Sequence, residues 1–412
     1  MKKIICLLLT LYCFQFTHAQ NNNAPSSFDI HDIKITGYLQ AQYQRTQSPG
    51  AYTWSGGDFD ESSESRFMIR RGRLKIDRVD KYSNIVFQID GTQDGVRLMD
   101  AFIQFGMPSL PALKLTAGLF NRPFGYSIVY SSGYRDFPER ARVFQTLMPR
   151  ERDLGAMISY KPEGKFKFLT TELAVVNGSG LNAKDYDNKK DIIGNLYFKF
   201  DSIGQKPLHI GFGSSFYEGS VVSVESTVFH SQKGGYQKID KASNKQDNFS
   251  RRYLGFNFQL ELETGFGETT FKTEYIYGQQ PGLAASVDIN GPKASTSLGE
   301  LPTGSLYLRP FEGYFIWLTQ ALGNSKFTAI AGLDMYDPNT DLNEKEIGLA
   351  QNYSTAGDVK FTTFGYGLTY NVNPRVKFTI YNEHVRNDAT QLTTHLTDLK
   401  DDVFTARLQY RW

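Results

Sequence analysis

The sequence predicts an all-β protein whose fold is a transmembrane antiparallel β-barrel of about 16 strands. Residues 404–412 alternate apolar and polar side chains without a break and end on Trp412. Segments of similar alternation recur along the chain, and the connections between them are short or long in turn. A strand with one apolar and one charged face needs a different surrounding on each side. A barrel provides lipid outside and water inside, whereas a soluble sandwich would cover the apolar face with a second sheet.

The first residues have the pattern of a Sec signal peptide. Lys2 and Lys3 precede an apolar stretch over residues 4–16, and Ala19 is a small residue at the expected cleavage position. The apolar stretch is too short to cross a bilayer as a helix. We therefore predict a signal peptide over 1–19, a short periplasmic N-terminal segment over 20–33, and a transmembrane barrel domain over 34–412.

Composition narrows the classes of function. The 412 residues include 45 basic and 43 acidic side chains, and two of the basic ones, Lys2 and Lys3, lie in the predicted signal. The remaining charges balance and are interleaved, so the sequence gives no support to nucleic-acid binding. Both cysteines, Cys6 and Cys13, also lie in the signal, which leaves the exported part without disulfides. Aromatic residues make up 14%, as expected of a barrel with aromatic girdles at two interfaces.

About 16 segments are rich in β-branched and aromatic residues and are separated by Gly, Asn, Asp, Pro and Ser, which is typical of strands and turns. They cover residues 34–45, 65–77, 82–90, 98–107, 113–121, 154–162, 167–178, 191–200, 208–218, 251–263, 267–279, 305–321, 325–336, 360–373, 376–387 and 401–412. An even number of strands returns both ends of the chain to the periplasmic side. No segment keeps a helical period, so we predict a single barrel domain.

The pattern within and between these segments favours the barrel over the sandwich. In 251–263, Phe256 and Phe258 share one face, while Asn257 and Gln259 share the other. Short connections such as 372–375 are typical of periplasmic turns. Long polar connections are predicted to be external loops, and they cover residues 219–250, 280–304, 337–359 and 388–400. A soluble sandwich has no reason to gather long loops at one end and tight turns at the other.

Residues 122–153 interrupt the strand pattern. A long connection without a strand of its own is usually functional. This one is also more apolar than the other long loops, with Phe124, Ile128, Phe137 and Phe144 among its side chains. We expect it to fold into the lumen as the third external loop and to narrow the channel. It carries four acids, Asp136, Glu139, Glu151 and Asp153, and six arginines, Arg122, Arg135, Arg140, Arg142, Arg150 and Arg152.

The run from Arg66 to Asp153 resembles the phosphate-selective porins O and P of Gram-negative outer membranes. The matching pieces are Arg70-Arg71-Gly72-Arg73-Leu74, Asp100-Ala101-Phe102-Ile103, Gly118-Leu119-Phe120-Asn121-Arg122-Pro123-Phe124-Gly125 and Pro149-Arg150-Glu151-Arg152-Asp153-Leu154-Gly155. The terminal Trp412 and the number of strands extend the resemblance over the whole exported chain.

The resemblance implies a barrel that is often trimeric, with an inward loop and a constriction lined by arginines and lysines. Guanidinium groups match the oxygens of anions in pairs, so several in series can pass an anion along. Transferred by position, the candidates for the constriction and for anion binding are Arg122, Arg135, Arg140, Arg142, Arg150 and Arg152. On the second predicted strand, Arg71, Arg73 and Lys75 share one face and are candidates for the channel wall. Residues 122–153 contain no lysine, on which phosphate-selective members partly rely.

A structural role is the alternative for each of these arginines. They can pair with acids of the same segment or with Asp90 and Asp100 on predicted strands, and so hold the loop in place. Arg70 is out of register with Arg71 and Arg73, so it either faces lipid near the barrel rim or marks a bulge. A charge facing lipid at mid-bilayer costs roughly 2–4 kcal/mol.

Two other classes of function remain as alternatives. An outer-membrane hydrolase needs a histidine beside a serine. The histidines after the signal lie in no such motif and are not spaced as metal ligands; they are His31, His209, His230, His384 and His395. We therefore predict no catalytic residue, metal or cofactor. The second alternative is a non-conducting adhesin or receptor that acts through loops 219–250 and 280–304.

The sequence thus predicts an exported outer-membrane porin through which small solutes diffuse passively, with a preference for anions or phosphate as a further hypothesis. Its predicted partners are outer-membrane lipid, small anionic or neutral solutes, and the barrel assembly machinery. We expect Trp412 to act as a membrane insertion signal for that machinery. The resemblance adds further copies of the chain in a homotrimer.

Overall fold

Antiparallel strands with alternating side chains form most of the structure. The computed structural model describes residues 33–181, 185, 187–201, 203, 207–284 and 304–412. The residues from Lys34 onward form one compact unit. The predicted signal peptide and most of the segment 20–33 lie outside the described residues.

The strands are β1 (Ile33–Thr46), β2 (Ser65–Val79), β3 (Ser83–Thr92), β4 (Gly95–Met107), β5 (Leu110–Asn121), β6 (Arg152–Tyr160), β7 (Leu169–Val176), β8 (Asp191–Phe200), β9 (Leu208–Val222), β10 (Thr227–Gln232), β11 (Gly235–Asp240), β12 (Asn248–Thr264), β13 (Gly267–Gly282), β14 (Leu306–Ala321), β15 (Phe327–Asp337), β16 (Phe361–Asn373), β17 (Val376–Asn387) and β18 (Val403–Arg411). The short helices are α2 (Arg142–Leu147), η2 (Gly164–Phe166), η4 (Ala242–Asn244) and η5 (Ala356–Asp358).

Sixteen of these strands close into a barrel. Each wall strand pairs antiparallel with its neighbours in sequence, with β9 passing directly to β12, and β1 pairs with β18 from Tyr38↔Arg411 to Thr46↔Val403. Closure leaves no strand edge unpaired in the wall, which a sheet surrounded by lipid requires. The predicted fold class is confirmed, because each of the 16 predicted segments coincides with one wall strand.

The two remaining strands, β10 and β11, form a hairpin in the long connection between β9 and β12. The sequence pattern did not predict them. Each has six residues, and β10 is stabilised from a distant part of the chain: it pairs parallel with β14, and Phe229 stacks on Tyr307 with ring centroids 4.4 Å apart. Short strands of this kind depend on tertiary packing that local propensity does not show.

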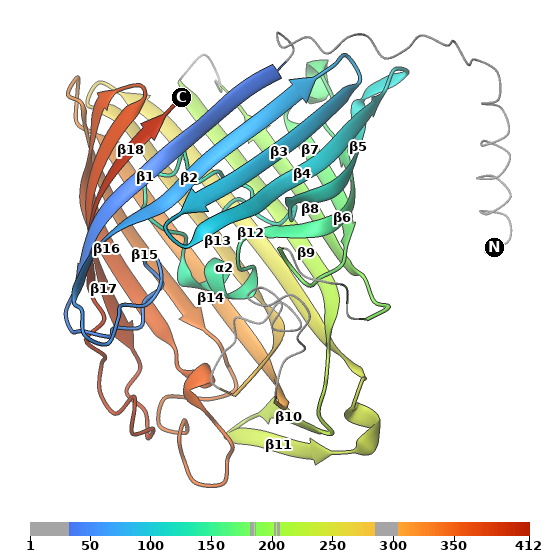
Figure 1. Ribbon diagram of the computed structural model, residues 1–412, viewed down its shortest axis with the longest axis vertical. Coiled ribbons are helices and arrows are strands. Elements are labelled where there is room, and N and C mark those ends of the chain that lie inside the picture. Colours follow the sequence, from blue (N-terminus) through green and yellow to red (C-terminus); the bar gives the residue numbers. More distant parts are fainter. Residues whose placement is uncertain (1–32, 182–184, 186, 202, 204–206, 285–303) are drawn as a thin grey trace, which may run out of the picture. The chain divides into compact units, whose positions relative to one another are not determined.

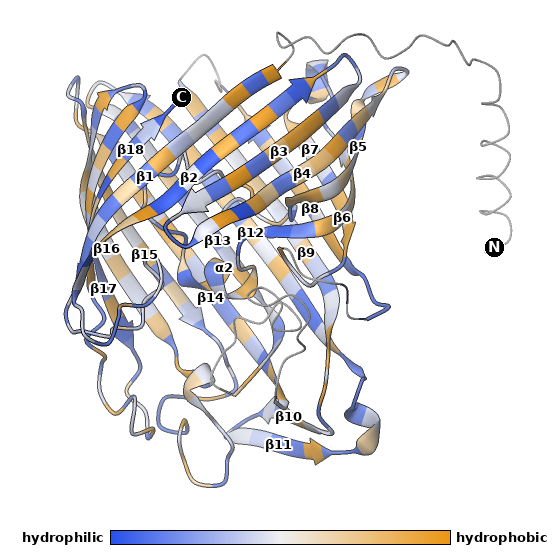
Figure 2. Ribbon diagram, in the orientation of Figure 1, coloured by the Kyte–Doolittle hydropathy of each residue, from blue (hydrophilic) through white to orange (hydrophobic). Residues whose placement is uncertain are grey.

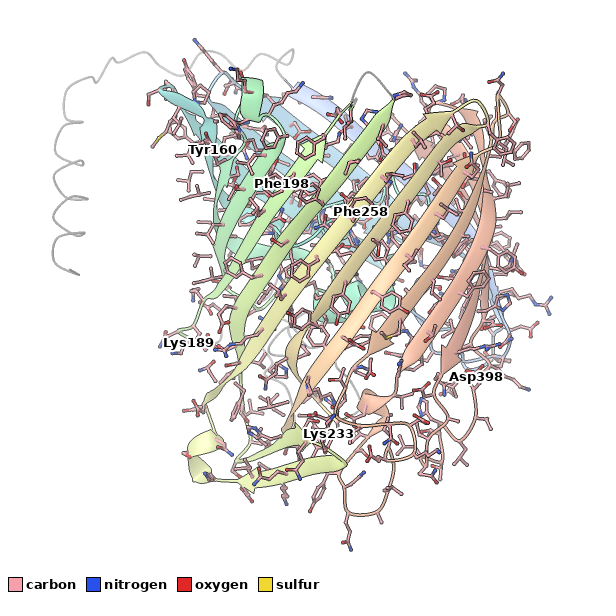
Figure 3. The ribbon with its side chains drawn as sticks, turned by 180° about the vertical axis from the view of Figure 1, so that it is seen from behind. Tyr160, Lys189, Phe198, Lys233, Phe258 and Asp398 are labelled. Atoms are coloured by element: carbon pink, nitrogen blue, oxygen red, sulfur yellow. The ribbon has the colours of Figure 1, made fainter. Side chains whose placement is uncertain are left out.

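The wall has an apolar outer face and a polar inner face, and the alternation along each strand is visible in Figure 2. On β12 the outward Phe256 is 47% exposed, whereas the inward Asn257 is 6% exposed. Figure 3 shows Phe198 and Phe258 on the strands of the wall, and Lys189, Lys233 and Asp398 in loops at one end. An exposed apolar band around a closed barrel indicates that the surrounding of the wall is lipid.

Connections of different length gather at the two ends of the barrel (Figure 1). Short turns and the C-terminus lie at one end, and the hairpin of β10 and β11 lies at the other end with the long loops. The connection between β5 and β6 is the third of the long-loop end. Among the described residues, no helix has the length and apolar content needed to cross a membrane.

Candidate functional site

The connection between β5 and β6, which we call the inward segment, covers residues 122–151 and contains α2. Its two ends are joined at the wall. Arg122 Nη2 lies 2.8 Å from Asp153 Oδ2, and the Arg122 amide donates to the carbonyl of Glu151. Both side chains of this ion pair are almost fully buried, so the pair closes the base of the inward segment.

A sharp bend after the base turns the chain inward. Gly125 has a φ of 58°, and an added Cβ would collide with the Glu274 carboxylate of β13. Only glycine combines this left-handed backbone with so close an approach. The same carboxylate accepts hydrogen bonds from the amides of Tyr126 and Ser127, at 3.2 and 2.7 Å. The Arg-Pro-Phe-Gly motif at 122–125 therefore encodes the bend.

Apolar side chains of the inward segment pack on one wall of the barrel, where inward-facing glycines leave room for them. A Cβ on each of these glycines would lie 2.8 Å from a side-chain atom of the segment. The pairs are Phe124 with Gly255, Phe137 with Gly332, and Val143 with Gly313. Phe137 also stacks on Trp317, with ring centroids 4.6 Å apart. These contacts bury the apolar side of the segment against β12, β14 and β15.

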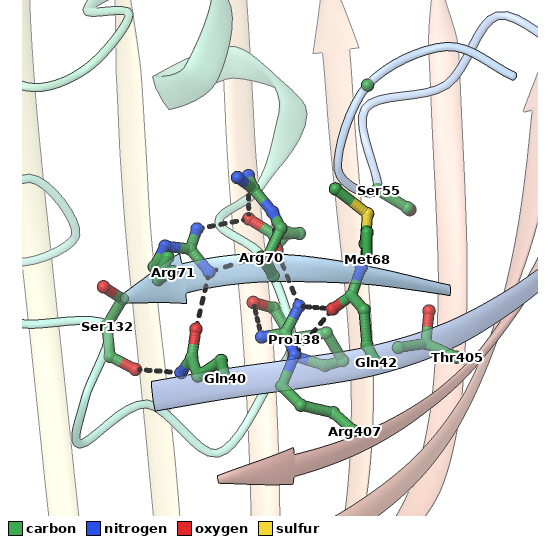
Figure 4. A network of polar contacts seen from close by, with 12 residues as sticks. Gln40, Gln42, Ser55, Met68, Arg70, Arg71, Ser132, Pro138, Thr405 and Arg407 are labelled. Atoms are coloured by element: carbon green, nitrogen blue, oxygen red, sulfur yellow. Dashed lines mark hydrogen bonds and ion pairs between the residues drawn. The ribbon is translucent and has the colours of Figure 1, made fainter. Parts of the chain in front are cut away.

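Polar groups attach the segment to the opposite wall, formed by β18, β1 and β2. Glu139 accepts hydrogen bonds from Arg70 at 2.8 Å, Arg71 at 2.6 Å and Arg407 at 2.8 Å. Figure 4 shows these three arginines converging from β2 and β18. Burial alone would raise the pKa of Glu139, but the three guanidinium groups hold it well below its usual range. Glu139 is therefore ionised, and the segment contacts both walls of the lumen.

Arg70 was predicted either to face lipid or to mark a bulge, and the structure contradicts the first of these predictions. Arg70 does not face lipid, because it bonds to Glu139 inside the barrel. Its neighbour Arg71 bonds to the same carboxylate, so two consecutive side chains point inward. The alternation of β2 therefore shifts by one residue between Arg70 and Arg71, as in the bulge that was the other expectation.

Of the cavities beside the inward segment, two are rich in arginine. The outer cavity, of about 410 Å³, opens toward the long loops and is lined by four acids, Asp58, Asp90, Glu139 and Glu151, and by six arginines, Arg70, Arg71, Arg73, Arg97, Arg140 and Arg150. The inner cavity, of about 520 Å³, opens toward the short turns and is lined by two acids, Asp77 and Asp100, and by seven bases, Lys34, Arg73, Lys75, Arg140, Arg152, Arg375 and Arg411. Basic side chains outnumber acids in both.

Arg73 and Arg140 line both cavities and so separate them. Arg140 is held in place by the carbonyl of Ser127 at 2.6 Å and by an ion pair with Glu151. Burial lowers the pKa of Arg140 to about 10, which leaves the guanidinium charged at neutral pH. Arg73 donates to Asp90 at 3.3 Å from the wall. Two held positive charges therefore lie where the two cavities meet.

The structure brings some of the expected residues to these cavities. Arg71, Arg73 and Arg150 line the outer one, and Lys75 and Arg152 line the inner one. Lys75 pairs with Asp77 at 2.8 Å, and Arg152 pairs with Asp100 at 2.9 Å and Glu151 at 2.7 Å. Arg152 thus lines the inner cavity and also forms ion pairs of the kind expected from a purely structural role.

Three of the expected arginines lie elsewhere. Arg122 closes the base of the inward segment, away from both linings. Arg135 is buried, and its two terminal nitrogens have no hydrogen-bond partner in the part of the chain that the structure describes. Arg142, in α2, faces a third cavity that is described below. Proximity in sequence therefore does not separate the arginines that face water from those that do not.

Several basic residues of the cavities are absent from the sequence-based set. Arg97 is exposed and lines the outer cavity, opposite Asp90 in the register of β3 and β4. The predicted strand began at residue 98, one position too late to include it. Lys34, Arg375 and Arg411 line the inner cavity near the short turns. For Arg411, the alternation of polar and apolar residues at the end of the chain was a signal that could have placed its side chain inside the barrel.

Histidines and metal sites do not supply a competing centre among the described residues. His384 is on the outer face of β17, with Nδ1 2.9 Å from Asp402 and its ring stacked on Tyr366. His209 Nδ1 lies 2.9 Å from Asp201. Within the described ranges, no group of three or more His, Cys, Asp or Glu side chains is arranged to hold a metal ion.

Comparisons with known proteins identify the architecture. No protein-family model matches the chain, and no curated protein matches its sequence. Solved outer-membrane proteins match its structure over 92% of its length. OmpF of Salmonella typhi, in complex with daunomycin, has 9% identity, 97% of its chain covered and a TM-score of 0.54. The outer membrane channel DcaP of Acinetobacter baumannii has 8% identity, 97% covered and a TM-score of 0.53. The trimer form of OmpT of Vibrio cholerae has 11% identity, 99% covered and a TM-score of 0.51.

Identities this low show a shared fold and nothing finer. The chain has the architecture of outer-membrane porins, with a lipid-facing wall and a polar interior.

Proposed function

We propose that the protein is an outer-membrane porin that lets small solutes diffuse passively and prefers anions. The observation that supports this most strongly is the pair of cavities on either side of Arg73 and Arg140, each with more basic than acidic side chains. Charged groups in a confined, partly desolvated route act on an ion more strongly than they would in bulk water. Several paired arginines in series attract an anion without trapping it.

The finer parts of this function follow from the sequence and the neighbours. The residues before the barrel have the pattern of an export signal, and Trp412 at the end of the last strand serves insertion by the assembly machinery. A homotrimer is consistent with the trimer form described for the Vibrio cholerae neighbour. Inorganic phosphate is the first anion to compare with chloride, because a guanidinium fork matches its oxygens.

Planar bilayer recordings on the purified protein test the function. We expect discrete conductance steps, whereas a protein that inserts without conducting would support the adhesin or receptor instead. The preference is tested by neutralising one exposed or half-exposed base in each cavity, with the double variant Arg97→Gln and Lys75→Gln. We expect the zero-current potential in a salt gradient to lose at least half of its shift toward the anion.

A matched control is Arg252→Gln on the outer face of β12. Arg252 pairs with Glu218, and both side chains are more than half exposed. Its removal should leave the potential unchanged. If the control changed the zero-current potential as much as the double variant does, the proposal that ions pass through the two cavities would be contradicted.

A further inference from the structure

A third cavity, which we call the aromatic cavity, lies at the long-loop end and has about 280 Å³. Distant parts of the chain meet around it: Tyr52 and Trp54 from the first long loop, Arg142 from α2, Phe361 from β16, and His395 and Asp401 from the loop before β18. Four of its 13 lining residues are Tyr, Trp or Phe and only one is an arginine, whereas the outer cavity has six arginines. The two cavities therefore suit different chemistry.

Arg142 is a buried cation without an ion pair in the described part of the chain. Its side chain is 5% exposed, and its Nε has no hydrogen-bond partner among the described residues. The guanidinium carbon lies 3.6 Å from the centroid of the Phe361 ring and 5.9 Å from that of Trp54. Stacking on aromatic faces offsets part of the cost of burying this charge. The carboxylates of Asp334, Asp401 and Glu383 also favour this charge, but none of them forms a salt bridge with Arg142 in the described part of the chain.

Asp401 adds a second unsatisfied group at the same cavity. It is 4% exposed, and its Oδ1 has no hydrogen-bond partner among the described residues. A buried polar atom without a partner is rare in folded proteins and marks a place where a ligand or an ordered water belongs. Arg142 and Asp401 thus each bring an unsatisfied polar atom to one cavity, and Asp401 accommodates an anionic ligand only while its own carboxyl is neutral.

We propose that the aromatic cavity binds a small organic carboxylate with a flat apolar body, such as an aromatic acid. The carboxylate accepts hydrogen bonds from Arg142, and the flat body lies against the rings of Trp54 and Phe361. An inorganic anion would leave the aromatic walls unused. A neutral sugar would leave Arg142 without a counter-charge, and an organic cation would be repelled by it.

The position of the cavity connects this binding to the lumen. Tyr52 and Trp54 line both the aromatic cavity and the outer cavity, so the two are neighbours. A carboxylate held at Arg142 is thereby close to the arginines of the outer cavity. Binding at equilibrium does not require the barrel to conduct, so the inference does not depend on the proposed function.

Titration of the detergent-solubilised full chain with three probes tests the class of ligand. Benzoate has both the charge and the flat body, benzamide has only the body, and acetate has only the charge. Tryptophan emission reports binding, and the variant Trp54→Phe identifies which of the three tryptophans responds. We expect saturable binding of benzoate at least tenfold tighter than that of benzamide and of acetate. Equal affinity of either partial probe overturns the proposal.

Two variants test the residues. Arg142→Gln should weaken benzoate at least tenfold, and Phe361→Leu should weaken it severalfold while the charge remains. The control Arg252→Gln should bind benzoate as the unmodified protein does. Unchanged benzoate affinity in Arg142→Gln overturns the proposal. If Arg142→Gln does not fold, two tests of the proposal remain. They are the comparison of the three probes on the unmodified protein and the affinity of Phe361→Leu for benzoate. A protein that binds benzoate but does not conduct ions would contradict the proposed channel function and leave the proposed binding site intact.

Discussion

The Arg407 guanidinium on the last strand lies 2.8 Å from the Glu139 carboxylate of the inward segment, 268 residues earlier in the chain. Arg70 and Arg71 bond to the same carboxylate from the second strand. The ionised Glu139 thus joins the inward segment to the strands at which the barrel closes. Removing its charge leaves three guanidinium groups around a neutral side chain, and those of Arg71 and Arg407 are buried.

The variant Glu139→Gln should therefore loosen the inward segment without opening the barrel. We expect trypsin to cut after Arg135 or Arg140 at least tenfold faster, because both are shielded in the unmodified protein. The rate is followed by electrophoresis of the folded protein in lipid vesicles. Glu64→Gln, in an exposed pair with Arg45, should leave the rate unchanged. Equal protection of Glu139→Gln would show that the apolar contacts alone hold the segment.

Arg122 should contribute to stability and not to ion preference. Arg122→Met leaves Asp153 buried without its counter-charge, which costs about 3–5 kcal/mol. Urea unfolding in detergent or vesicles measures this loss. Replacing both partners, with Arg122→Met and Asp153→Leu, should recover part of it. The recovery is incomplete because Asp153 also accepts from the amide of Gly180 at 3.2 Å. Exposed Arg252→Met should change stability by less than about 1 kcal/mol.

Binding of benzoate in the aromatic cavity should weaken as pH rises from about 6 to about 8. Burial raises the pKa of Asp401 to about 7 against the opposing effect of Arg142, and Asp398 and Asp402 add to the rise. Below this pKa the Asp401 carboxyl is neutral, and above it the negative charge repels a bound carboxylate. Burial lowers the pKa of His395, which favours the neutral form of this ring.

The variant Asp401→Asn should remove most of this pH dependence and keep the tight binding seen at low pH. Benzoate itself stays ionised throughout the range. A pH dependence that persists in Asp401→Asn would assign the titration to another group.

Arg97 should face the conducted ions. The chain has cysteine only at positions 6 and 13, both in the predicted signal, so Arg97→Cys would give the exported protein a single thiol. We expect a negatively charged methanethiosulfonate reagent to reduce anion preference further, and a positively charged one to restore it. The effects are followed in planar bilayers. The matched control is Phe256→Cys on the lipid face of β12, where modification from water should not change the current.

Sequence patterns predicted the wall well because each wall strand carries its own signal. Alternation such as that of Phe256 and Asn257 reports the lipid and the lumen directly, without knowledge of any partner strand. The hairpin of β10 and β11 has no such signal, because packing on Tyr307 stabilises it. The shift in alternation between Arg70 and Arg71 could not be decided from sequence, because it depends on both side chains turning inward to reach Glu139.

The cavity linings were harder to predict than the wall. Within the inward segment, Arg122 and Arg140 look alike in sequence, yet Arg122 is sealed against Asp153 while Arg140 separates two cavities. The difference lies in which wall each arginine meets, and that depends on strands far away in the chain. Arg97 was missed because it begins a strand, where boundaries from sequence are least certain.

The zero-current potential of the unmodified protein in a tenfold potassium chloride gradient tests the central claim most directly. Basic side chains outnumber acids around both cavities, so the account predicts a potential displaced toward the equilibrium potential of chloride. The displacement should shrink at high salt, because added ions screen the exposed charges. A potential at zero, or displaced toward the equilibrium potential of potassium, would contradict the account.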